Sequence, residues 1–78
     1  LLGVGYEMIG QTEKAISALN RTIQLAPGHI HAWNNLGAIY FHLEQWAKAQ
    51  KAFQTALKID PEFKAAQANL RAFRKRLP

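Results

Sequence analysis

The stretch that decides the fold is residues 31–61, HAWNNLGAIYFHLEQWAKAQKAFQTALKIDP. Apolar and small residues recur in it three, four and seven places apart, which is the spacing of one stripe on an α-helix. The two stripes are Trp33, Leu36, Gly37 and Tyr40, and then Ala49, Ala52, Phe53, Ala56 and Leu57. The stretch therefore predicts two amphipathic helices that bury their stripes against each other.

A glycine lies inside the first of these predicted helices. Glycine in a helix interior costs about 1 kcal/mol relative to alanine, yet Gly37 has a counterpart 34 residues earlier, at Gly3. Such a repeated cost indicates a packing reason. We expect the missing side chain to let the second helix approach the first closely.

The whole pattern recurs when the sequence is shifted by 34 residues. The matched pairs are Leu2 with Leu36, Gly3 with Gly37, Tyr6 with Tyr40, Ala15 with Ala49, Ala18 with Ala52, Leu19 with Phe53, Ile23 with Leu57, Leu25 with Ile59 and Pro27 with Pro61. A period of this length with a W-x2-L-G-x2-Y run, a small-x3-large step and a proline is the tetratricopeptide signature. The chain therefore resembles the tetratricopeptide repeat (TPR) family over nearly its whole length.

The resemblance implies an all-α fold of antiparallel helix-turn-helix repeats, stacked as an α-solenoid with a right-handed superhelical course. We expect helices near 1–10, 12–25, 30–43, 46–59 and 62–77. These helices form a repeat with a truncated first helix (1–29), a complete repeat (30–63) and a C-terminal capping helix (64–78). Because solenoid repeats are stabilised by their neighbours, we expect a longer array that ends near Pro78, or a core completed by self-association.

Two places in the predicted turns call for glycine. Gly10 is predicted to be the left-handed residue that ends the first helix. Glu44 stands at the matching place in the next repeat, where a left-handed non-glycine residue costs roughly 1 to 2 kcal/mol. That turn is therefore either mildly strained or built differently, while Pro27 and Pro61 are expected to lie between hairpins.

The net charge of +5 is concentrated at one end of the chain. Residues 1–63 hold five basic and five acidic residues, and the whole surplus is Lys64, Arg71, Arg74, Lys75 and Arg76. Three places of the helical stripe also become polar here, because Gln67, Arg71 and Arg74 align with Trp33, Gly37 and Tyr40. A helix that must accept another repeat does not tolerate this, so the segment is interpreted as a cap with its charged face outward.

The sequence offers no catalytic, cofactor or metal constellation. It has no cysteine and one serine, Ser17, without a nucleophile motif around it. His31 and His42 are eleven residues apart, or roughly 16 Å along a helix, so they cannot share a metal. No apolar run approaches the ~20 residues of a membrane span, and the start lacks signal-peptide features. We predict a non-enzyme without cofactor, and the compartment is left open.

Partner binding is the function that the resemblance implies, because first helices of TPR arrays line a concave surface that holds proteins or extended peptides. The predicted binding residues are Glu7, Met8, His31, Asn34, Asn35, Ala38, Phe41, His42 and Asn69, with Val4, Ala65, Ala68 and Ala72 completing the lining. Asn35 and Asn69 recur at one place and resemble the asparagine ladder of some TPR proteins. Phe41 either serves the groove or packs on the capping helix.

Two further functions stay open at this point. The truncated first repeat exposes an edge through which the chain could form a homo-oligomer. The basic cluster at 71–76 could contact nucleic acid or an anionic surface, although such charges also suit a solvated helix end, where they complement the helix dipole.

Overall fold

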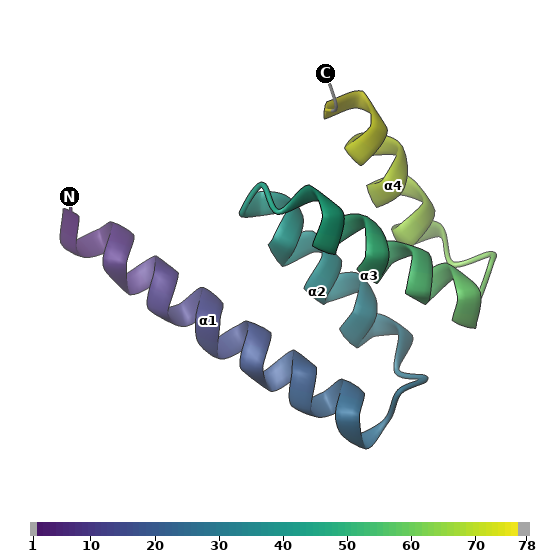
Figure 1. Cartoon of the computed structure of the whole chain (residues 1–78), viewed down its shortest axis with the longest axis horizontal. Helices are drawn as coiled ribbons and strands as arrows, with labels where there is room; N and C mark the ends of the chain where they lie inside the picture. The colour runs from purple at the N-terminus through teal and green to yellow at the C-terminus, as the bar shows by residue number, and fades with distance from the viewer. Residues whose placement is uncertain (1, 77–78) are drawn as a thin grey trace.

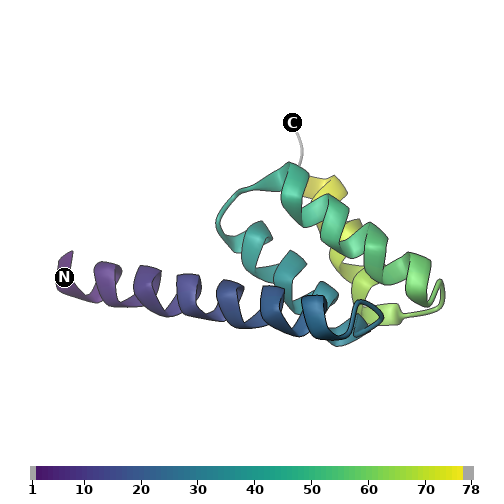
Figure 2. The same ribbon diagram turned by 60° about the horizontal axis from the view of Figure 1, so that its bottom comes forward.

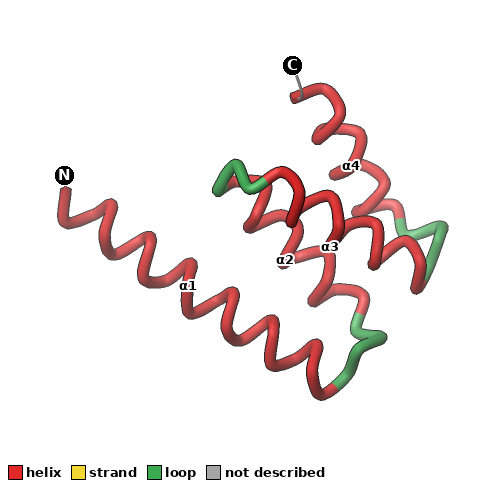
Figure 3. The backbone as a smooth tube through the Cα atoms, viewed as in Figure 1, coloured by secondary structure: helices red, strands yellow, loops and turns green. Residues whose placement is uncertain are grey.

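The computed structural model describes the backbone of residues 2–76 and the side chains of residues 10–75. It contains four helices, α1 (Leu2–Leu25), α2 (Ile30–His42), α3 (Trp46–Ile59) and α4 (Lys64–Arg76), and no strand among the described residues (Figure 3). The all-α fold of successive antiparallel helices confirms the predicted fold class.

Helix α2 is the centre of the molecule, because it contacts each of the other three helices. Helix α3 lies across α2 and also packs on α4, whereas α1 runs along one side of α2 (Figure 1). The N-terminal half of α1 extends away from the other helices, as two views of the chain agree (Figures 1 and 2). The packed part of the fold is therefore α2, α3, α4 and the second half of α1.

The α2–α3 hairpin buries the two stripes that the sequence predicts. Phe53 is fully buried, and its ring lies on Gly37: a Cβ added to that glycine would come within 2.6 Å of the Phe53 ring. The expected packing reason for Gly37 is thus confirmed. The buried members of the stripes are Leu36, Gly37, Ala49, Ala52, Phe53 and Ala56, with Trp33, Tyr40 and Leu57 half-buried.

Two equivalent hydrogen bonds fix the loops on either side of this hairpin. The indole Nε1 of Trp33 donates to the carbonyl of Pro27 at 2.8 Å, and the amide Nε2 of Gln67 donates to the carbonyl of Pro61 at 2.7 Å. The two donors are 34 residues apart in the sequence, and so are the two acceptors. Gln67 stands at the place in α4 that Trp33 has in α2. It is polar where Trp33 is aromatic, but it makes the same hydrogen bond to the preceding loop.

The predicted break at Gly10, between helices 1–10 and 12–25, is wrong, because α1 is a single helix of 24 residues. No glycine among the described residues has a positive φ, so Gly10 is an ordinary helical residue. A turn there would leave helix-terminal backbone groups without partners.

Helix α4 begins at Lys64, two residues later than the predicted 62, and its last described residue is Arg76. The reason lies in the preceding turn, where an Asp60 side-chain oxygen accepts a hydrogen bond from the Glu62 amide at 3.0 Å. Such an Asp turn competes with helical hydrogen bonding at its own residues. The other predicted helix ends, in α2 and α3, agree with the structure to within one residue.

The end of α2 has the left-handed turn that Glu44 was expected either to adopt or to avoid. Glu44 has a φ of 61°. Its amide donates to the carbonyl of Phe41, and the Gln45 amide donates to that of Tyr40, at 3.0 and 2.9 Å. These are the two hydrogen bonds of a Schellman motif. The turn is therefore built in the usual way, at a conformational cost of roughly 1 to 2 kcal/mol because its residue is not glycine.

Candidate partner-binding surface

A recess of about 180 Å³ lies between α2 and α4, on the helices that the sequence predicts to carry the binding surface. We call it the α2–α4 recess. Small and aromatic side chains form most of its wall, so it suits an apolar group. Its lining is Ala38, Phe41, His42, Phe53, Asn69 and Ala72.

A hydrogen-bonded pair of amides stands at this recess. The Nδ2 atom of Asn69 donates to the Oδ1 atom of Asn34 at 3.0 Å, and both residues are half-buried. An amide side chain has two N–H donors and an oxygen with two lone pairs. Each partner therefore retains hydrogen-bonding capacity for a peptide group laid across the pair.

The amide pair differs from the expected ladder of Asn35 and Asn69. Asn35 is exposed, and the residue that reaches Asn69 is Asn34, which is 35 rather than 34 residues away. Two helices packed side by side meet residue to residue according to their axial offset, which the repeat period does not determine. The contact of Asn69 with Asn34 is thus an addition to the predicted ladder, and the binding roles of Asn35 and Asn69 stay a prediction.

Three aromatic rings connect the recess to the capping helix. The Phe41 ring centroid lies 5.4 Å from that of Trp46, and the Trp46 centroid lies 6.0 Å from that of Phe73, with both pairs edge to face. Phe73 is buried and Phe41 is half-buried. Phe41 therefore lines the recess and is connected to Phe73 of α4 through Trp46, and its role in binding a partner stays a prediction.

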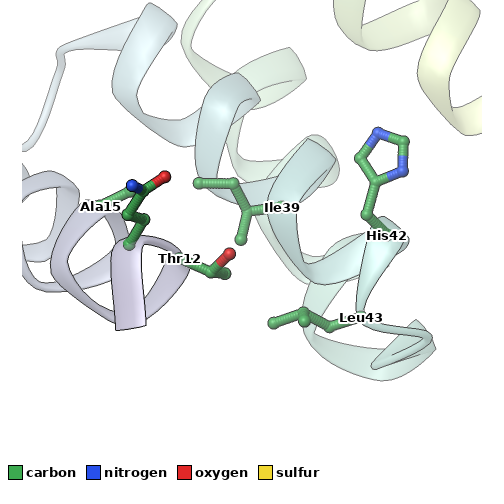
Figure 4. A pocket seen from close by; sticks show the side chains of 6 residues that line it. Thr12, Ala15, Ile39, His42 and Leu43 are labelled. Atoms are coloured by element: carbon green, nitrogen blue, oxygen red, sulfur yellow. The ribbon is translucent and has the colours of Figure 1, made fainter. Parts of the chain in front are cut away.

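The two predicted histidines lie in different surroundings. His31 is exposed at the start of α2, where its ring is 5.4 Å from that of Phe63, away from the recess. His42 lines the α2–α4 recess and also a second recess, of about 300 Å³, between α1 and α2. In the second recess Thr12 and Ala15 lie across from Ile39 and Leu43 (Figure 4).

Of the remaining predicted residues, Ala38 lines the α2–α4 recess. The side chains of Glu7 and Met8 lie outside the described residues. The sequence analysis missed Phe53, which was assigned to the core alone but also contributes to the recess wall. Gly37 was the available signal, because a residue without a side chain lets a ring on the opposite helix reach through to the far side.

Among residues 10–75, whose side chains the structure describes, no three His, Cys, Asp or Glu side chains gather closely enough to hold a metal ion. Within residues 2–76, none of the helices combines the length and apolar character that a bilayer crossing requires. What the geometry offers is an apolar recess beside amide groups.

Paired helices that recur every 34 residues and pack only on their neighbours define an α-helical repeat protein. Residues 5–78 match the family described as "Tetratricopeptide repeat". The chain belongs to the tetratricopeptide repeat family. Members of this family are generally protein-interaction scaffolds and typically non-catalytic.

Three relatives carry the same family name. "Tetratricopeptide repeat domain-containing protein PYG7, chloroplastic" of Arabidopsis thaliana is 34% identical over 76 residues, which are 97% of this chain and 25% of that protein. Human "Tetratricopeptide repeat protein 6" is 40% identical over 60 residues, 77% of this chain and 12% of that protein. "Tetratricopeptide repeat-containing protein trd-1" of Caenorhabditis elegans is 40% identical over 50 residues, 64% and 6% respectively. The chain thus spans a quarter or less of each relative.

Proposed function

We propose that the chain is part of a longer TPR scaffold and that it binds a protein partner in the α2–α4 recess. In this proposal residues 1–29 are a truncated first repeat, residues 30–63 are a complete repeat and residues 64–78 are the capping helix. The partner is an extended segment of another protein. Binding rather than catalysis is the activity.

One observation carries the proposal: the Asn34–Asn69 amide pair stands beside an apolar recess of about 180 Å³. A cavity of about 150 Å³ is known to hold a benzene molecule, so this recess suits one aliphatic side chain. The amide pair supplies a donor and an acceptor for the backbone next to that side chain. Together they favour an extended segment with a single apolar anchor.

The test is selection of a peptide library displayed on phage against the chain, followed by titration of the selected peptides. Asn69→Ala should weaken binding about 2- to 12-fold, the effect of one lost hydrogen bond. Ala72→Trp, which fills the recess, should weaken it further. Asn35→Ala is the matched control, because it removes the same side chain from an exposed position of α2 and should leave the affinity unchanged.

Equal losses for Asn35→Ala and Asn69→Ala would contradict the proposed site, as would peptides that still bind the Ala72→Trp variant. Thermal unfolding of each variant serves as the folding control. Asn69 is only half-buried, so its replacement is expected to leave the fold intact.

Self-association is a second candidate function, and one observation favours it. Ala18 of α1 is exposed, whereas its equivalent in α3, Ala52, is buried. A second copy of the chain could cover this face of α1. Sedimentation at several concentrations tests the idea: Ala18→Lys should convert a dimer to a monomer, and a wild-type chain that is monomeric at every concentration excludes it.

A further inference from the structure

A second groove lies at the other side of the capping helix, away from the amide pair. It has a volume of about 390 Å³ and is formed by α3 and α4. We call it the terminal groove. Its lining is Leu57, Gln67, Leu70, Arg71 and Arg74.

The 34-residue repeat aligns the terminal groove with a place on α2 that helix α3 already covers. Its four α4 residues align with Trp33, Leu36, Gly37 and Tyr40 of α2, which is the stripe on which α3 packs. Leu57 of α3 aligns with Ile23 of α1. The terminal groove is therefore equivalent to the place on α2 that a helix, α3, covers.

The side chains of the terminal groove do not accommodate a helix like α3, which covers the equivalent stripe of α2. Arg71 replaces Gly37, and even a Cβ at Gly37 would come within 2.6 Å of the Phe53 ring. A helix that presents a large apolar residue there, as α3 does, cannot approach α4 as closely. A helix that binds here must instead carry groups that pair with a guanidinium.

The groove combines charge at its rim with an apolar floor. Arg71 and Arg74 are exposed and three residues apart, so they stand on one side of α4, while Leu57 and Leu70 are half-buried below them. The sequences of α3 and α4 contain no acidic residue. Their basic residues are Lys48, Lys51, Lys58, Lys64, Arg71, Arg74, Lys75 and Arg76.

We propose that the terminal groove binds an acidic amphipathic helix of a partner protein. The apolar stripe of that helix lies on Leu57 and Leu70, and carboxylates three or four residues apart pair with Arg71 and Arg74. Arginine suits this role because its planar guanidinium binds a carboxylate through two parallel hydrogen bonds. An apolar floor favours an amphipathic helix over single-stranded nucleic acid, which proteins hold by stacking aromatic side chains on its bases, and none of the described residues that line the groove is aromatic.

The experiment uses the chain and a panel of fluorescein-labelled peptides of about 15 residues, stapled to be helical because free peptides of this length are only marginally so. Each peptide carries leucines three and four residues apart with glutamates beside them. A second panel replaces the glutamates with glutamine. Fluorescence anisotropy at about 0.05 M and 0.15 M salt measures affinity and its screening.

Arg71→Gln combined with Arg74→Gln should weaken the glutamate peptides about 10-fold, as expected for the loss of two ion pairs at the edge of an apolar contact. Lys64→Gln combined with Lys75→Gln is the matched control. It removes the same charge from exposed sites of the same helix outside the groove, and should change the affinity less than about 2-fold. Thermal unfolding verifies that both variants fold.

Three outcomes overturn the proposal. Equal losses in the two double variants mean that only the general positive charge attracts the peptide. Equal binding of the glutamate and glutamine panels means that the arginines do not recognise carboxylates. Tighter binding of a single-stranded oligonucleotide, lost alike in both variants, assigns the basic surface to nucleic acid.

Discussion

Helix α3 and the second half of α1 carry the same stripe of residues and bury it to different degrees. In α3 the stripe is almost completely inaccessible: Ala49, Phe53 and Ala56 are 0% exposed and Ala52 is 3% exposed. In α1 none of its equivalents is buried; Ala15, Leu19 and Thr22 are half-buried and Ala18 is exposed. Helix α3 contacts both α2 and α4, whereas α1 contacts α2. In a solenoid, therefore, a stripe predicts which face is apolar, and the neighbouring helices decide how much of it is buried.

Truncating the large residue of each stripe should give the largest difference between the two helices. Phe53→Ala should lower the free energy of unfolding by about 3 to 5 kcal/mol, because a fully buried ring leaves a cavity. Leu19→Ala should lower it by only about 1 kcal/mol, since Leu19 is half-buried and water replaces the lost contacts. Urea denaturation monitored by circular dichroism measures both. Equal losses of unfolding free energy in the two variants would mean that this face of α1 is buried in solution.

Adding a methyl group at a glycine should change the free energy of unfolding in opposite directions in α2 and in α1. Gly37→Ala brings a Cβ against the Phe53 ring and should lower the free energy of unfolding by about 1 to 2 kcal/mol, because overpacking exceeds the gain in helix propensity. Gly10→Ala meets no atom within 4 Å and should raise it by about 0.5 to 1 kcal/mol. A loss of stability for Gly10→Ala would favour a turn at that residue over the continuous α1.

The turn after α2 has no counterpart within α1, and it offers a smaller gain. Glu44→Gly should raise the free energy of unfolding by about 1 kcal/mol, because glycine adopts a φ of 61° without steric cost. Glu44→Ala separates this effect from the loss of charge, since alanine keeps the strain. Comparable stabilisation by both substitutions would trace the effect to the carboxylate instead.

The smallest expected effect concerns the two loop hydrogen bonds. Gln67→Met keeps the side-chain length and removes the donor to Pro61, and should lower the free energy of unfolding by about 0.5 kcal/mol, because the bond is exposed. Trp33→Phe should cost more, since the half-buried indole is also truncated. Thermal unfolding of the two variants measures the difference. Stability unchanged by Gln67→Met would show that water replaces this hydrogen bond in full.

The sequence was sufficient for the parts of the fold that depend on local pattern. Stripe spacing predicted the α2–α3 hairpin, and the repeated glycine predicted a close approach of the second helix, which the Phe53 ring makes at Gly37. It was insufficient where the outcome depends on neighbours or on axial offsets. Gly10 suits a turn, but α1 continues through it as one helix, and the Asn34–Asn69 contact depends on how far α4 slides along α2.

The hydrogen bonds from Trp33 to Pro27 and from Gln67 to Pro61 each join residues six places apart. Each joint between hairpins is consequently held by a hydrogen bond within its own segment, residues 26–33 in one case and 60–67 in the other, while the rings of His31 and Phe63 connect the two segments. Exchanging the residues of one segment for those of the other should transfer the angle at which one hairpin follows the next. The curvature of a stack built from this chain would then be encoded in its joints and adjustable without altering either recess.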